Sequence, residues 1–432
     1  MLRRVDRAAG GLAADLGLYL VSAVFALVTA GTSTLLPHRA WGTIAGAGYL
    51  LAAAVVFGQM MVRRFGVPES PLTRDRARLA LTWLTWASVA ALPLNVEAVQ
   101  RAAGRTDRAQ EEVLVVEEMG RSLLETGTPY LSRAEIAALP LDDRLTGYRP
   151  YQPGMAVFGL PRALAGDHFW TDARVWFALT TLFTLLFSVR ALLAWSSRSG
   201  VPAGGVTPSP AVVRALQAAT VLPVTALTLA TGGDDIPVLA LCLLALTLAA
   251  IGRFGWSGVA VGVAASAKLF AFPVVAVLAV LAVVSGRGRR YLPFALGLPV
   301  LALLPPLLVN ADALIENVLR FPLGHGLVTS PAQSPFPGYL IAQNLPGGRL
   351  LAAALLVGAA LAIGVHLLRR PPRTAATAAL ICGYGLLAAI LLMPTTRFGY
   401  LLYPAALLLW SPALRSSTPG PQQPHRYFQP TG

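Results

Sequence analysis

Apolar stretches of about 20 residues recur along most of the chain, separated by short polar segments. As a helix, each stretch is long enough to cross a hydrocarbon core of about 30 Å. Two neighbouring stretches, 255–268 and 270–285, are shorter, which predicts half-helices on either side of a break at 268–273. The pattern predicts an all-α polytopic membrane protein with about twelve transmembrane helices, at 13–36, 41–62, 78–96, 170–192, 211–231, 235–251, 255–268, 270–285, 291–309, 348–368, 374–393 and 397–412.

Arginine residues are distributed unevenly among the segments between these stretches. If Met1 starts in the cytoplasm, every predicted cytoplasmic segment is basic, and the short segments on the other side contain almost no basic residues. Cytoplasmic loops of membrane proteins carry this excess of positive charge. We therefore predict a multi-pass protein of the cell membrane with both termini in the cytoplasm and with two long outer loops, 95–172 and 310–347.

The same pattern predicts one transmembrane domain over 1–412, followed by a disordered cytoplasmic tail, 413–432, that is rich in Pro, Gln and Ser. The composition agrees, because 55% of the residues are hydrophobic and 12% are charged, whereas about 25% of residues are charged in soluble domains. A net charge of +14 would suit a nucleic-acid-binding protein. The arginines lie mainly at helix ends, however, where membrane topology accounts for them.

The first outer loop opens with a stretch, 109–124, whose apolar positions follow a helical period. We expect an amphipathic helix on the membrane surface, ending before the sequence Thr126-Gly-Thr-Pro-Tyr130. Glu111 and Glu112 stand at its start. A carboxylate there could act as a general base that removes a proton from a hydroxyl group, or it could belong to a solvated acidic face near a helix N-terminus.

Other polar residues on the predicted outer side are candidates for binding. Tyr148 and Tyr151 stand beside an apolar segment, where aromatic side chains anchor a protein at the interface or stack on sugar rings. Asp234 and Asp235 lie at the mouth of a membrane helix, where charge is costly and often marks a functional cavity. Asp235 is also a candidate N-cap, with a proline in the first turn.

Few cations are predicted on the outer side, and those few could bind an anion. Lys268 is the only lysine of the chain; it could extend to the interface or bind a lipid phosphate. Arg320 and His325 lie in the second outer loop, and Arg397, followed by Tyr400, lies between the last two stretches. Each arginine could equally be an ordinary interface residue. Cysteine, histidine and acidic residues show no metal-ligand spacing, so we expect no metal or other cofactor.

Several of these residues occur in motifs that resemble those of a known family. The motifs are Glu112 followed by Gly127-Thr-Pro-Tyr130, Tyr148-x-x-Tyr151-x-Pro153, Gly233-Asp-Asp-Ile236, Ala265-Ser-Ala-Lys268 with Pro273, and Arg397-Phe-Gly-Tyr400. Because these motifs occur in this order, the chain resembles the polyprenol-phosphate-mannose-dependent mannosyltransferases of glycosyltransferase family 87, which are C-type integral membrane glycosyltransferases. The resemblance extends over roughly 80–410, although the family usually has Asp where this chain has Glu112.

The resemblance implies an inverting transfer of a sugar, with mannose expected, from a polyprenyl-phosphate donor to a glycan or lipid-glycan acceptor on the outer face. Glu112 or Glu111 would be the base, and Asp234 would position the acceptor. Lys268, Arg320 and Arg397 would stabilise the leaving phosphate. A transporter or lipid flippase is the alternative, but it would need polar residues within the membrane and access from both sides. A structural membrane protein without chemistry is a third interpretation.

Overall fold

The computed structural model describes residues 8–66, 70–198 and 208–415; part of the predicted tail, 416–432, lies outside them. Over the described residues the chain is helical, and the β-structure consists of an isolated bridge between Gln333 and Thr396. The helices are α2 (Leu12–Thr32), α3 (Leu36–Phe65), α4 (Asp75–Trp86), α5 (Leu92–Ala102), α6 (Glu111–Thr126), α7 (Arg133–Ala138), α8 (Arg144–Gly147), α9 (Leu160–Ala165), α10 (Ala173–Arg198), α11 (Pro210–Thr220), α12 (Pro223–Thr231), α13 (Asp235–Ala250), α14 (Phe254–Ala267), α15 (Phe272–Val284), α16 (Gly288–Ile315), α17 (Pro337–Asn344), α18 (Gly348–Arg369), α19 (Ala375–Leu392) and α20 (Leu402–Arg415).

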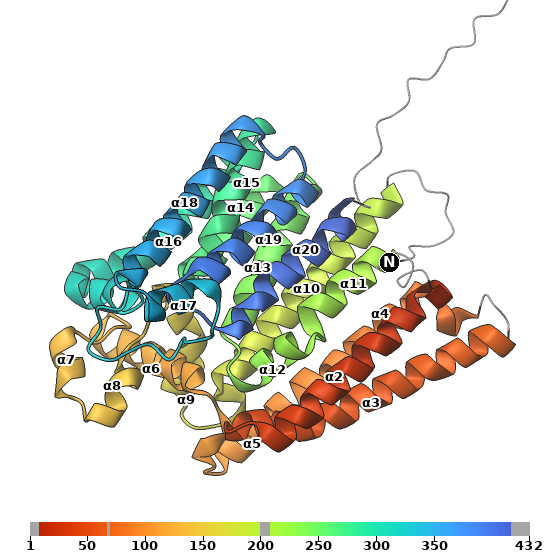
Figure 1. Cartoon of the computed structure of the whole chain (residues 1–432), viewed down its shortest axis with the longest axis horizontal. Helices are drawn as coiled ribbons and strands as arrows, with labels where there is room; N and C mark the ends of the chain where they lie inside the picture. Colours follow the sequence, from red (N-terminus) through yellow and green to blue (C-terminus); the bar gives the residue numbers. More distant parts are fainter. Residues whose placement is uncertain (1–7, 67–69, 199–207, 416–432) are drawn as a thin grey trace, which may run out of the picture.

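Long helices pack side by side, and the short helices α6 to α9 of the first long loop gather at one end of the bundle (Figure 1). Among the described residues, seven helical segments are long and apolar enough to cross a membrane, or eight if the pair α11 and α12, bent by 42°, is one span. The chain is therefore a multi-pass membrane protein. All twelve predicted stretches contain a helix. The count of twelve spans is not confirmed, because α13, α14 and α15 are shorter than a full span and α20 has 14 residues.

The third membrane helix runs further than its sequence pattern predicts. α4 and α5 belong to one span, Asp75–Ala102, joined by a π-helical turn at Ala87–Ala91. Pro93 stands near the start of α5, and a proline inside a helix cannot donate the usual backbone hydrogen bond. In membrane helices, local π-helical adjustments can satisfy the backbone groups that a proline frees. The helix consequently continues past residue 95, where the first long loop was predicted to begin, and ends at Ala102.

The second predicted long loop, 310–347, begins as helix in the structure. α16 continues to Ile315, with a sharp change of direction at Asn310, where φ is −156° and ψ is 88°. A π-helical turn, Glu316–Arg320, then leads into an irregular segment and α17. The predicted loop boundary at residue 310 thus coincides with a kink inside a helix.

The predicted break near Lys268 is confirmed. α14 ends at Ala267, and Lys268 has an extended backbone with φ −153° and ψ 142°. A short 3-10 turn, Leu269–Ala271, precedes α15, which has Pro273 in its first turn. Lys268 therefore lies in the short connection between two apolar helices, and its side chain is buried inside the protein.

The structure corrects the expected position of the amphipathic helix, α6. Its apolar residues Val113, Val116 and Met119 are fully buried within the protein, so this face packs on protein and not on lipid. Gly120 and Gly159 bring α6 into close contact with the turn Pro153–Gly159; a Cβ on Gly120 would lie 2.3 Å from the Gly159 carbonyl carbon. The helix ends at Thr126, one residue later than predicted, and Gly127 follows with a left-handed backbone (φ 75°).

Candidate functional site

A cavity of about 690 Å³ lies among α6, the α12–α13 turn, the break at Lys268 and the segment before α20. These segments are far apart in the sequence, and each contributes at least one charged side chain. Of the eleven site residues predicted from the sequence, nine line this cavity: Glu111, Glu112, Tyr148, Tyr151, Asp234, Asp235, Lys268, Arg397 and Tyr400. Their placement together is observed, and their roles remain predictions.

Lys268 forms ion pairs with two consecutive carboxylates. Its Nζ lies 2.8 Å from Asp234 and 2.5 Å from Asp235. The sequence predicted that Asp235 caps its helix, but its side chain makes no capping hydrogen bond. Its carboxylate instead accepts a hydrogen bond of 2.8 Å from the Tyr403 hydroxyl. A lysine with its side chain 9% exposed keeps its charge at low cost only when carboxylates neutralise it. Lys268 therefore does not extend to the interface.

Aromatic rings surround this ion cluster. The Lys268 ammonium lies 5.2 Å from the ring centre of Tyr151 and 5.9 Å from that of Tyr400. Phe270 contacts Tyr400 and stacks on Tyr403, with ring centres 4.7 and 5.1 Å apart. The pKa of Tyr151 is raised well above its usual range, mainly by burial and to a lesser extent by the nearby negative charges of Asp234 and Glu112. The phenol of Tyr151 is thus neutral at physiological pH.

Glu112 forms an ion pair with Arg397 across the cavity. Burial lowers the pKa of Arg397, but the adjacent Glu112 carboxylate more than offsets this effect, so the pKa is raised and the guanidinium stays charged. This pair is more open to solvent than the lysine cluster, with side chains 37% exposed for Arg397 and 17% for Glu112. Glu112 is therefore a carboxylate that a substrate in the cavity can reach.

Sequence reasoning missed a linked set of polar residues that also line the cavity, His38, Gln110 and Thr231. The side-chain amide nitrogen of Gln110 lies 2.7 Å from His38 Nε2. The Thr231 hydroxyl donates to the Gln110 side-chain oxygen over 3.2 Å. His38 lies in the turn between the first two apolar stretches, on the predicted outer side; that position is the signal that could have found it.

Two predicted residues, Arg320 and His325, are not among those that line the cavity. Arg320 forms ion pairs with Asp312 (3.0 Å) and Glu316 (3.4 Å), and its side chain is 44% exposed. The carbonyl of His325 accepts a hydrogen bond from Arg133. Neither residue therefore lines the cavity that contains Lys268 and Arg397.

Glu316 connects the two long loops, 310–347 and 95–172. Its carboxylate is fully buried, pairs with Arg133 (2.8 Å) and accepts a 2.8 Å hydrogen bond from the Tyr148 hydroxyl. The Tyr148 ring stacks on Phe321 with ring centres 4.1 Å apart, and both residues line the cavity. Tyr148 thus forms part of the cavity wall and at the same time links the two loops.

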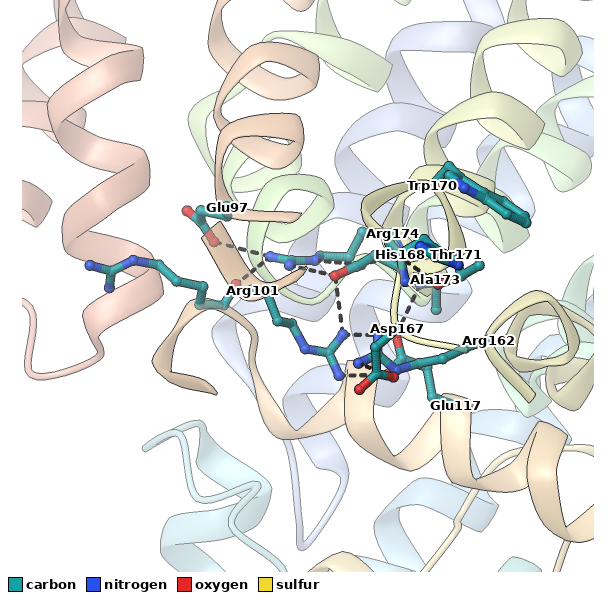
Figure 2. A network of polar contacts seen from close by, with 12 residues as sticks. Glu97, Arg101, Glu117, Arg162, Asp167, His168, Trp170, Thr171, Ala173 and Arg174 are labelled. Carbon is teal, nitrogen blue, oxygen red and sulfur yellow. Dashed lines mark hydrogen bonds and ion pairs between the residues drawn. The ribbon is translucent and has the colours of Figure 1, made fainter. Parts of the chain in front are cut away.

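A buried ionic network fixes α6, which carries Glu112, to the membrane helices α5 and α10 (Figure 2). Arg101 pairs with Glu117 (2.6 Å) and with Asp172 (3.1 Å). Arg174 pairs with Asp172 (2.8 Å) and with Glu97 (3.0 Å). Burial raises the pKa of Asp172, but Arg174 and Arg101 more than offset it and lower the pKa to about 2.

The network also reaches the two segments that enter the cavity. Arg174 donates to the backbone carbonyls of Arg108 (2.7 Å) and Ala230 (3.1 Å). The first carbonyl precedes Gln110 and α6, and the second precedes the turn that leads to Asp234. Arg174 thereby helps to set the spacing between the two acidic sides of the cavity, together with the Gln110 backbone N–H, which donates to the Thr231 carbonyl over 3.0 Å.

Comparison with known families decides the class of protein. The sequence model of glycosyltransferase family 87 matches residues 150–394, which is more than half of the chain. The chain belongs to glycosyltransferase family 87. This family 87 member is therefore a membrane glycosyltransferase, with nine of its predicted site residues around one cavity.

Two solved structures are also similar to this family 87 member. They are crystal structures of ArnT from Cupriavidus metallidurans, one bound to undecaprenyl phosphate (18% identity, TM-score 0.47) and one in the apo state (20% identity, TM-score 0.45). The matches cover 78% and 77% of this chain and 60% of each ArnT chain, so this chain corresponds to less than two thirds of their length. No curated protein matches the sequence.

Proposed function

We propose that this glycosyltransferase transfers a sugar, mannose by family resemblance, from a polyprenyl-phosphate donor to a glycan or lipid-glycan acceptor on the outer face of the cell membrane. The observation that supports this proposal best is that Glu112, Asp234, Lys268 and Arg397 line one cavity at the loop end of the membrane helices. A carboxylate that can take a proton and cations that can stabilise a phosphate are the two groups that such a transfer needs.

In the proposed reaction, Glu112 removes the proton from an acceptor hydroxyl. The hydroxyl oxygen attacks the anomeric carbon of the sugar from the face opposite the phosphate, the bond between that carbon and the phosphate oxygen breaks, and the lipid phosphate leaves with the electron pair. The configuration at the anomeric carbon is inverted. Glu111 also lines the cavity and is the second candidate base.

Negative charge grows on the phosphate as its bond to the sugar breaks. Among the described residues that line the cavity, Arg397 is the arginine and Lys268 is the lysine. We propose that these two cations stabilise the charge on the phosphate. Asp234 is assigned to the acceptor, and the rings of Tyr151 and Tyr400 beside Lys268 form a surface on which a sugar ring can stack.

A reconstituted assay tests the proposal. The full chain in proteoliposomes would be supplied with radiolabelled polyprenyl-phosphate mannose and membrane glycan acceptors, and labelled product would be measured for wild type, Glu112→Gln and Glu111→Gln. Removing a general base typically costs about 10²- to 10⁴-fold in rate, so Glu112→Gln should lose at least a hundredfold and Glu111→Gln much less.

The two variants separate the assignments because both remove one carboxylate from the same end of α6. Wild-type transfer by Glu112→Gln would show that the base lies elsewhere, and a larger loss in Glu111→Gln would move the role to Glu111. Absence of transfer by the wild-type protein from any polyprenyl-phosphate sugar, in membranes where it is folded, would refute the donor class.

A further inference from the structure

The cavity contains more negative than positive charge before any substrate binds. Among the described residues that line it, Glu111, Glu112, Asp234 and Asp235 are acidic, whereas Lys268 and Arg397 are basic. Both cations are already paired with carboxylates. A phosphate that enters the cavity must therefore compete with these carboxylates for a cation, because an unpaired anion in a partly buried site is costly.

The two cations are held differently. Lys268 is shared by two carboxylates, its side chain is 9% exposed, and Asp235 is further fixed by the Tyr403 hydroxyl. Arg397 has one carboxylate partner, Glu112, and its side chain is 37% exposed. A guanidinium also matches the geometry of phosphate oxygens better than an ammonium does. Arg397 is thus the cation that can change partner at lower cost.

Resting on the proposed function, we infer that the lipid phosphate of the donor displaces Glu112 from Arg397, so that donor binding itself releases the catalytic base. In the structure, an Oε of Glu112 accepts a hydrogen bond from Arg397. While this pair persists, the guanidinium offsets the negative charge that would attract the proton of an acceptor hydroxyl. Once the phosphate holds Arg397, the Glu112 carboxylate is free to face the acceptor, and the base acts only when a donor is in place.

The exchange also accounts for the reset of the site after transfer. A phosphate monoester, the product, carries about −1.5 to −2 charge at pH 7 and holds Arg397 more strongly than the donor diester does. After transfer Glu112 carries the proton of the acceptor hydroxyl; when that proton has passed to the phosphate or to solvent, Glu112 is again an anion and pairs with Arg397 as the lipid phosphate leaves. Glu112 therefore competes with the product and assists its departure.

This inference makes an unusual prediction, namely that loss of the base strengthens binding of the lipid phosphate. The purified full chain in nanodiscs would be titrated with undecaprenyl phosphate. Glu112→Gln removes the competitor for Arg397, and for this half-buried pair we expect the dissociation constant to fall about tenfold, equivalent to about 1.4 kcal/mol. Glu112→Asp, with its carboxylate one methylene further away, should give a smaller decrease and serves if the Gln variant does not fold.

Glu111→Gln is the matched control, because it removes the same charge from the same helix end and Glu111 is not the partner of Arg397. Its dissociation constant should change by less than about threefold, a few tenths of a kcal/mol. Arg397→Gln should weaken binding about tenfold or more, and in that background Glu112→Gln should no longer tighten it. Equal tightening by the two glutamate variants, or tightening that persists without Arg397, would overturn the exchange.

The outcomes distinguish this inference from the proposed function. If the wild-type protein transfers sugar and binds undecaprenyl phosphate but Glu112→Gln binds it equally or more weakly, the exchange is wrong and the proposed function stands. If folded wild-type protein neither binds undecaprenyl phosphate nor uses a polyprenyl-phosphate donor, both are wrong.

Discussion

Arg174 is the residue whose replacement should most clearly separate a buried ionic network from surface charge. Its side chain and those of Glu97 and Asp172 are 0%, 0% and 1% exposed. Replacing Arg174 with Met retains much of the volume but leaves two buried carboxylates without this cation. Breaking a buried pair in this way costs about 3–5 kcal/mol. At roughly 2 °C per kcal/mol for a large protein, the melting temperature should fall by about 6–10 °C.

The assay is thermal unfolding of the purified chain in one detergent, with Arg105→Ala as the control. Arg105 pairs with Asp107 near the same end of the protein, but the side chains are 54% and 30% exposed, and pairs as exposed as this contribute little. The melting temperature of that variant should match wild type. If Arg174→Met also melts like wild type, the network does not stabilise the fold and the reasoning from burial is refuted.

A rescue experiment separates lost charge balance from lost packing. Adding Glu97→Gln and Asp172→Asn to Arg174→Met removes the two buried carboxylates that had paired with Arg174, so part of the lost stability should return. Sugar transfer should not return, because the carbonyls of Arg108 and Ala230 still lack their donor and the spacing across the cavity is no longer fixed. Recovery of activity together with stability would show that Arg174 has no positioning role.

Two further predictions concern the packing and the pH response of the same region. Gly120→Ala should destabilise the protein by about 1–3 kcal/mol, because the new Cβ would lie 2.7 Å from the Gly159 oxygen. The melting temperature should therefore fall. Gly358→Ala is the control and should melt like wild type, because a Cβ at Gly358 would have no heavy atom within 4 Å. Asp172 has its pKa lowered from 3.8 to about 2, so its contribution of about 2 kcal/mol is fully present above pH 4 and lost as the pH falls through about 2. Asp172→Asn should remove this part of the acid response, and an unchanged pH profile would contradict it.

The features that the sequence predicts well are those that depend on a local pattern. The break at Lys268 was predictable because a lysine and, soon after, a proline interrupt an apolar stretch. The end of α6 at Gly127 follows from one residue that tolerates a left-handed backbone. Asp234 was a candidate because a charge at the end of a membrane helix needs a partner or water. In each case the signal lies within a few residues of the feature.

Features that depend on which distant segment supplies the partner were not predictable. The period of α6 shows an apolar face, but a face that packs on protein and a face that lies on lipid have the same period. The burial of Val113, Val116 and Met119 and the contact between Gly120 and Gly159 show that α6 packs inside the protein. Similarly, Lys268 pairs with residues more than 30 positions earlier in the chain, and no local pattern relates them.

The two ionic clusters of this protein show why charge alone could not reveal which residues act on a substrate. Arg174 uses its Nε and both terminal nitrogens on carboxylates and backbone carbonyls, and its side chain is fully buried, so a ligand cannot reach it. Arg397 has one carboxylate partner and remains 37% exposed at a cavity. In the sequence both are arginines next to membrane helices. The difference between a structural and a functional ion pair lies in unused hydrogen-bonding capacity and in open space, and both arise only when distant segments of the chain meet.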